Sequence, residues 1–136
     1  MFRRSTLLLG TALAFSAAAA YSHHSFAMFD NQKETTIDGE VKDFQWTNPH
    51  IWIQVNVKGT DGKVTEYSIE GGSPNGLKRS GWTKKSLSAG DKISLTMHPL
   101  KDGSPGGSFM RAMVNGKPLG GTRAPEEYPA PAAAAK

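Results

Sequence analysis

Cysteine is absent from all 136 residues of the chain. Its absence excludes disulfides, zinc–thiolate centres, iron–sulfur clusters and covalently attached c-type haem. A long apolar run is missing as well, because the stretch from Leu7 to Ala20 is too short for a comfortable membrane span. A folded domain in this chain must therefore depend on its hydrophobic core for stability.

Catalytic sequence patterns are also missing. The chain has no Gly-x-Ser-x-Gly elbow, no Walker loop and no His-Glu-x-x-His, so we expect a protein that is not an enzyme. The excess of positive charge is small, since the formal net charge of +4 falls to +2 once Arg3 and Arg4 are removed. No basic stripe interleaved with aromatic residues accompanies it, and we therefore expect no nucleic-acid partner.

The N-terminal residues have the pattern of an export signal. An arginine pair precedes an apolar, alanine-rich run that ends in small residues. We predict that residues 1–22 are a cleavable signal peptide, which makes the mature protein periplasmic or secreted, without a stable membrane anchor. Cleavage after Ala20 and cleavage after Ser22 both satisfy the small-residue rule, and only the second makes His23 the first residue. General secretion is the expected route, because the twin-arginine consensus is poor.

The remaining chain is punctuated by turn signals at short intervals, which is typical of an all-β fold. About 110 residues remain after cleavage, enough for one domain, which we assign to 23–119. A short helix is expected where Ser73 can cap a turn that starts at Pro74. The segment 120–136 is rich in proline and alanine and is expected to be a disordered or extended tail. The predicted strands are 35–46, 50–57, 64–70, 92–100 and 108–114.

Three strands, a helix and two further strands follow one another in this prediction. This order predicts a small five-stranded OB-like Greek-key barrel, with one short helix between strands three and four. A plain β-sandwich is the alternative. The first strand favours the barrel, because Val41 has the opposite parity to Phe44 and a regular strand cannot bury both. A bulge or bend between these two residues, helped by Gly39, would let one long strand serve two sides of a barrel.

The histidines are the strongest chemical feature of the sequence, and they are His23, His24, His50 and His98. If cleavage follows Ser22, His23 carries a free α-amine with a pKa near 8, whose proton a metal displaces easily. The amine and Nδ1 of His23 then form a chelate ring, and a second imidazole completes an arrangement that resembles the histidine brace of exported copper proteins. Nitrogen ligands of this kind suit Cu(II), so copper is the expected ligand. No spacing motif links the histidines, and the alternative is that they are structural.

A second candidate surface needs no metal. Trp52 shares an outward strand row with His50, next to the Thr-Asn-Pro turn and in front of a glycine-rich loop. An exposed tryptophan in such a place indicates a site for a protein or small-molecule partner, whereas a Trp52 packed beneath the helix or the N-terminal segment would not. The residues of this surface are Trp52, Asn48, Gly71, Gly72 and Asn75.

Several segments also form recognisable motifs: His23–Phe26, Trp46–Ile53, Ile69–Asn75, Gly81–Trp82 and Gly90–Asp91. Together they resemble a family of exported bacterial proteins that is classed only as a domain of unknown function. The similarity spans about Ser22 to Val114. It implies a periplasmic or secreted location and no settled activity. It places His23, His24 and His50 inside the motifs that carry the resemblance.

Overall fold

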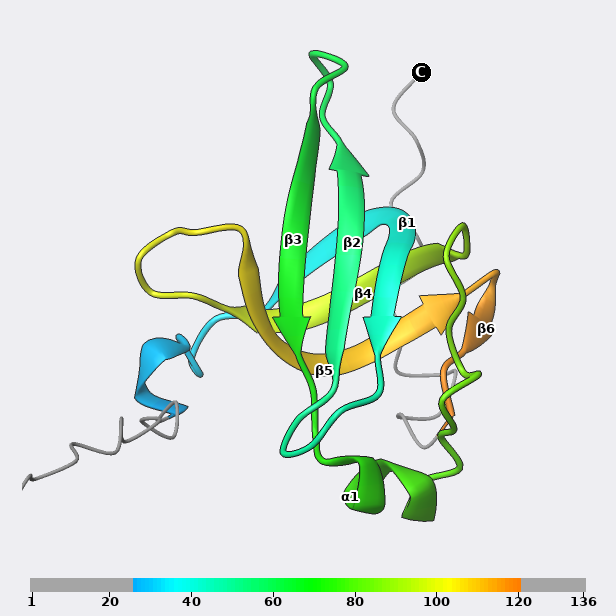
Figure 1. Cartoon of the computed structure of the whole chain (residues 1–136). Coiled ribbons are helices and arrows are strands. Elements are labelled where there is room, and N and C mark those ends of the chain that lie inside the picture. Colours follow the sequence, from blue (N-terminus) through cyan, green and yellow to red (C-terminus); the bar gives the residue numbers. More distant parts are fainter. Residues whose placement is uncertain (1–25, 121–136) are drawn as a thin grey trace, which may run out of the picture.

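The computed structural model describes residues 26–120, so the predicted signal peptide and almost all of the predicted tail lie outside the described residues. This part of the chain is a strongly curved sheet with one short helix at its lower end (Figure 1). Within it, no helix is long and apolar enough to cross a membrane. The elements are η1 (Phe26–Met28), β1 (Thr35–Gln45), β2 (Trp52–Lys58), β3 (Val64–Glu70), α1 (Pro74–Arg79), β4 (Lys92–Pro99), β5 (Gly106–Val114) and β6 (Lys117–Pro118).

The strands close into a barrel. Their order is β3-β2-β1-β4-β5-β6, and an additional pairing joins β3 to β5. That pairing is parallel and runs through Ser68–Glu70 and Gly106–Ser108, whereas the other pairings are antiparallel. This is the connectivity of an OB-type Greek-key barrel, with the helix between β3 and β4. The predicted fold is confirmed, and the sandwich alternative is wrong because one sheet closes on itself.

Strand β1 bends where the sequence pattern predicted it. Its first half pairs with β4 and its second half with β2, and the register with β2 shifts between Val41 and Asp43. Gly39 makes the crossing possible, because a Cβ atom there would lie 2.4 Å from the carbonyl oxygen of Asn56. The bulge brings Phe44 into contact with the core that also buries Val41, so both parities of β1 face apolar surroundings.

The hydrophobic core lies inside the barrel and is made of inward-facing side chains from β1 to β5. Ile51, Ile53 and Val55 are fully buried, as is Leu95 on β4. The lower end is plugged by Trp82, whose ring meets that of Phe109 edge-on at 5.2 Å. Val57 on β2 and Tyr67 on β3 also pack against this core but are only half-buried.

The helix begins as predicted, whereas some strand ends differ from the prediction. The Ser73 hydroxyl accepts a hydrogen bond from the backbone N–H of Gly76 at 3.2 Å, and Gly81 follows with a φ of +85°. The last long strand begins at Gly106 instead of residue 108, because its first residues supply the parallel pairing to β3. Strand β6 was not predicted, since two residues carry no periodicity.

Candidate functional site

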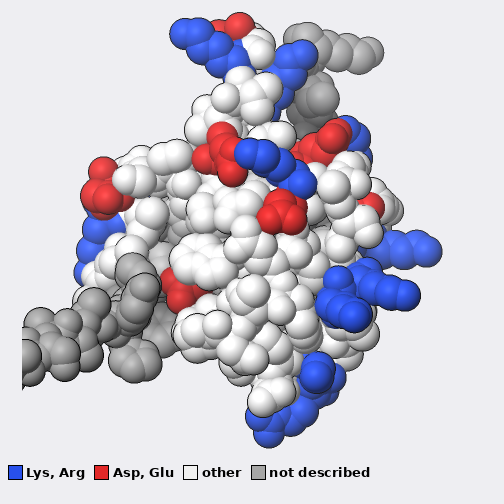
Figure 2. Space-filling view, in the orientation of Figure 1, with Lys and Arg blue, Asp and Glu red and all other residues white. Residues whose placement is uncertain are grey.

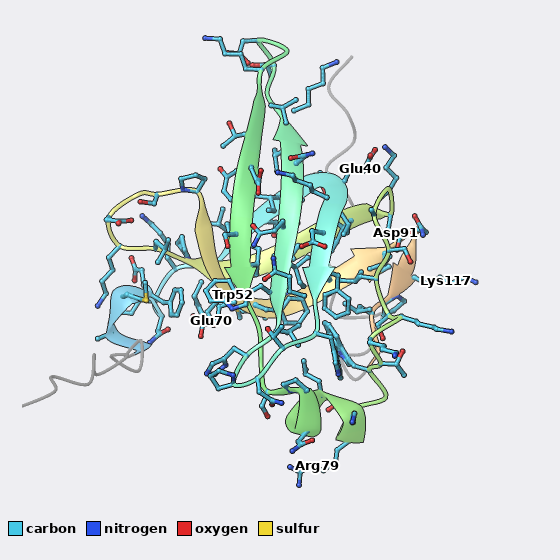
Figure 3. The ribbon with its side chains drawn as sticks, viewed as in Figure 1. Glu40, Trp52, Glu70, Arg79, Asp91 and Lys117 are labelled. Carbon is cyan, nitrogen blue, oxygen red and sulfur yellow. The ribbon has the colours of Figure 1, made fainter. Side chains whose placement is uncertain are left out.

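Four residues form a line across the outside of the barrel, which we call the outer row: Trp52, Glu70, Ser108 and His98. Each is the register partner of the next, from β2 through β3 and β5 to β4. Directly paired residues point to the same face of a sheet. Their chain neighbours Ile53, Ile69 and Met97 are buried, so the outer row faces away from the core. Figure 3 shows Trp52 and Glu70 together at the lower ends of β2 and β3.

His50 lies beside one end of this row and is held in a defined orientation. Its Nδ1 atom is 3.0 Å from the carbonyl oxygen of Gly71. Because a carbonyl only accepts, Nδ1 carries the proton and donates it, which leaves the lone pair of Nε2 available in the neutral ring. The ring is half-buried, with 35% of the side chain exposed. This is the arrangement that metal-binding histidines usually adopt, with the second nitrogen fixed by a carbonyl or carboxylate.

The loop that carries His50 is tied to the loop after β3. Ile51 and the glycine pair exchange backbone hydrogen bonds, from Gly71 N–H to Ile51 at 2.9 Å and from Ile51 N–H to Gly72 at 3.1 Å. A Cβ atom on Gly71 would come within 2.5 Å of the Ile51 side chain, so glycine is required for this close approach. Thr47 adds a hydrogen bond from its hydroxyl to the carbonyl oxygen of His50 at 2.9 Å. The two loops therefore form one support for the imidazole.

Glu70 is the residue of this site that sequence reasoning missed. Its carboxylate lies 3.7 Å from Nδ1 of His50, and only 11% of its side chain is exposed. Carboxylates that are this buried normally have a partner of opposite charge or strong hydrogen bonds. The available signal was its position in the Ile69–Asn75 motif. By itself, a glutamate at the end of a strand looks like an ordinary surface charge.

His98 lies at the other end of the outer row. Its Nδ1 atom donates to the carbonyl oxygen of Lys33 at 2.8 Å, which again leaves Nε2 available. The strands β5 and β3 separate it from β2, so the fold does not bring His98 next to His50. Across residues 26–120, no group of three His, Asp or Glu side chains is arranged to hold a metal ion.

The N-terminal part of the described chain runs along the β4 end of the outer row. Phe29 is buried and forms a β-bridge with Leu100, and the backbone N–H of Asp30 donates to the carbonyl oxygen of Pro99 at 2.9 Å. His23 and His24, the predicted chelating pair, lie outside the described residues. In Figure 1 the segment η1 lies on the same side of the barrel as the lower end of β3.

The β4–β5 loop beside η1 is ordered by its own hydrogen bonds. The backbone N–H of Ser104 donates to the carboxylate of Asp102 at 2.9 Å. That backbone hydrogen bond, together with one from the Ser104 hydroxyl, lowers the pKa of Asp102 below its usual value, because both stabilise the charged form. In OB-folds this loop and the β1–β2 loop flank the binding surface.

The second predicted surface is largely assembled at the His50 end. Trp52 is half-buried on the outer row, and Asn48 is exposed in the adjacent turn, whose Asn48–Pro49 peptide is cis. Gly71 and Gly72 lie beside them through the hydrogen bonds to Ile51. Asn75 is exposed in the first turn of α1. The fold therefore joins the metal candidate His50 and the tryptophan surface into one area.

Comparison with known proteins identifies a family and finds a similar solved structure. No curated protein matches the chain. Among solved structures, the chain is similar to the mitochondrial single-stranded DNA binding protein Rim1 from S. cerevisiae, with a TM-score of 0.48 and 9% identity over 62% of this chain and 95% of that one. The model of the Family of unknown function (DUF6152) matches residues 12–109. The chain belongs to this family of unknown function.

Proposed function

We propose that this protein is an exported binding module that captures copper at the His50 end of the outer row. The metal would be held by the amine and imidazole of His23, the imidazole of His24 and Nε2 of His50. The observation that carries the proposal is the hydrogen bond from Nδ1 of His50 to Gly71. It presents the free nitrogen of a fixed ring, which lowers the entropic cost of coordination.

The surroundings of His50 favour a cation. Glu70 places a mostly buried negative charge 3.7 Å from the protonated nitrogen of the ring. A carboxylate in this position would stabilise the positive charge of a metal bound to the ring. Glu70 is on the Nδ1 side of the ring, so its role is to act on His50 through its charge without binding the metal itself, while the carbonyl group of Gly71 positions the ring.

The remaining ligands must come from outside the described range. No third His, Asp or Glu joins His50 and Glu70 within residues 26–120, whereas His24 precedes Phe26 by two residues. At no more than about 3.6 Å per residue, the covalent chain keeps the Cα atom of His24 within about 7 Å of that of Phe26. Because the chain after Phe26 runs along the β4 end of the outer row, His23 and His24 would have to cross toward β2 to reach His50. An all-nitrogen ligand set favours Cu(II) over the harder divalent cations.

The first test is the intact mass of the exported protein, which identifies the mature N-terminus. A chain that begins at Tyr21 would eliminate chelation by the His23 amine. Copper titration of the processed protein then compares wild type with His23→Ala, His50→Ala and His98→Ala. We expect at least a tenfold loss of affinity for the first two variants, and wild-type affinity for the third.

The His98 variant is the matched control, because this ring has the same type of carbonyl hydrogen bond but lies at the other end of the outer row. Equal affinities for all four proteins would refute the site. A loss confined to His98→Ala would move the metal away from His50 and overturn the proposal.

The alternative function is an interaction module without metal. It is favoured by Trp52, which lies half-buried on an outward row beside the exposed Asn48 and Gly72. A protein or small-molecule partner would cover the indole. Acrylamide quenching of wild type against Trp52→Phe isolates the emission of Trp52 from that of the other two tryptophans, and a quencher-protected Trp52 would exclude this alternative.

A further inference from the structure

A hollow at the α1 end of the barrel has no part in the copper proposal. Its volume is about 570 Å³, and it is lined by Trp46, Lys78, Gly81, Trp82, Thr83 and Lys84. Trp82 is almost fully buried in its floor, while Trp46 is half-buried and leans edge-on against Phe44 at 5.8 Å. The hollow therefore combines the partly exposed indole of Trp46 with two lysines.

The two lysines have no counter-charge within the described part of the chain. Lys78 and Lys84 are exposed, and no carboxylate of residues 26–120 lies within 4.0 Å of either amine. Figure 2 shows that positive side chains gather around α1 and the segment after it, with few negative ones among them. The hollow thus suits an occupant that carries negative charge.

The described chain ends at the wall of this hollow. Leu119 is buried, and its backbone N–H donates to the carbonyl oxygen of Ala112 at 2.9 Å. Gly120 lies against the backbone of Ser80 and Gly81, and its carbonyl oxygen accepts a hydrogen bond from the indole N–H of Trp82. Residues 121–136 therefore start beside the hollow that Trp82 lines.

The sequence of that segment matches the hollow in two independent respects. It contains Pro125-Glu126-Glu127-Tyr128-Pro129, followed by Pro131. Proline-rich segments dock in aromatic-lined grooves, because the polyproline helix is already extended and loses little entropy on binding. Glu126 and Glu127 supply the charge opposite to that of the two lysines.

We propose that the hollow is the docking groove for this chain's own segment Pro125–Pro129. Its proline and tyrosine rings would cover Trp46, and its glutamates would face Lys78 and Lys84. Five residues at about 3.1 Å each give a reach of about 15 Å from Gly120 to Pro125. The covalent link gives the segment a millimolar-range effective concentration at the groove, so that even weak contacts hold it there. The metal site is elsewhere, and neither proposal depends on the other.

Carbodiimide cross-linking of the full mature chain tests this contact. The reagent joins a carboxylate and an amine as an amide, with loss of one water, only where the two groups touch. We expect a link from Glu126 or Glu127 to Lys78 or Lys84, mapped by mass spectrometry after digestion. A mixture of ¹⁵N-labelled and unlabelled chains at low concentration separates links within one chain from links between chains.

Matched variants assign the link. Lys78→Gln/Lys84→Gln should abolish it, whereas Lys58→Gln/Lys63→Gln, on the distant β2–β3 hairpin, should leave it unchanged. Glu126→Gln/Glu127→Gln should also shift the indole ¹⁵N–¹H signal of Trp46, assigned with Trp46→Phe, while the signal of Trp52 stays in place. Links spread evenly over the exposed lysines, links only between chains, or an unmoved Trp46 signal would each overturn the proposal.

Discussion

At the residue scale, the site depends on three neighbours in space: His50 in the loop before β2, Glu70 at the end of β3, and Gly71 just after it. The carbonyl oxygen of Gly71 accepts a hydrogen bond from Nδ1 of His50, and Glu70 adds a negative charge at 3.7 Å. His50 was predicted as a candidate ligand from its residue type and motif. Its orientation was not predictable, because it depends on a carbonyl 21 residues away in the sequence.

Glu70→Gln tests the electrostatic part of this arrangement. The amide keeps the size of the side chain but removes the charge that stabilises a metal-bound imidazole. Loss of a residue that supports a metal ligand typically lowers metal affinity about 10- to 100-fold. We expect a fall of about tenfold in copper affinity, because the Gly71 carbonyl still holds the His50 ring in place. Competition titration with a copper chelator measures it.

The control is Glu66→Gln, on the same strand and the same outward face. Glu66 forms an ion pair with exposed Lys42, and such a surface pair contributes about 0–1 kcal/mol to stability. Its copper affinity should equal that of wild type. If both variants bind copper equally well, Glu70 has no role at the metal.

At the element scale, β1 decides the shape of the barrel. The opposite parities of Val41 and Phe44 predicted its bend, and the register shift between Val41 and Asp43 confirms it. What the pattern did not reveal is how close the bent strand comes to β2. At Gly39 the backbones approach until there is no room for a methyl group.

Gly39→Ala should therefore destabilise the fold. The new Cβ atom would meet the carbonyl oxygen of Asn56 at 2.4 Å and Val55 Cγ1 at 2.8 Å. We expect a loss of about 1–3 kcal/mol in the free energy of unfolding, the usual cost of a forced clash in a packed region. Urea denaturation followed by circular dichroism measures it.

Gly72→Ala is the matched control, since its Cβ atom would make only ordinary contacts with Leu77 at 3.6 Å. Its unfolding free energy should stay the same or rise by up to about 1 kcal/mol, because alanine restricts the unfolded chain. A Gly39→Ala protein as stable as this control would mean that β1 and β2 do not approach so closely.

At the scale of the whole molecule, one core serves all five barrel strands. Each of these strands contributes to the same cluster of buried residues. Examples, in the order β1 to β5, are Val41, Ile53, Ile69, Leu95 and Ala112. The chain has no cysteine, so no disulfide contributes to its stability. We expect the domain to unfold in a single cooperative transition.

Leu95→Ala tests this expectation. Leu95 is fully buried, and its truncation should cost about 2–5 kcal/mol of unfolding free energy. The transitions seen by tryptophan fluorescence and by far-UV circular dichroism should coincide in both proteins and move together to lower urea. Val64→Ala, at a side chain that is 60% exposed, should leave the midpoint nearly unchanged. Separate transitions for the two probes would show that the barrel is not one unit.

The sequence by itself determined the features that neighbouring residues encode. Turn signals and local pattern identified the strands, the capping pattern at Ser73 identified the helix, and the parity change in β1 identified its bend. These features are local because side-chain direction in a strand repeats every two residues. The predicted export signal also depends on local pattern, and it remains a prediction.

Only the tertiary structure decided which distant residues meet. The parallel pairing of β3 with β5, the contact of Glu70 and Gly71 with His50, and the arrival of Gly120 at Trp82 all join segments far apart in sequence. No local pattern specifies such contacts, because they arise when the sheet curves and closes on itself. That closure places a charged partner beside one of the predicted histidines and leaves His98 at the other end of the outer row.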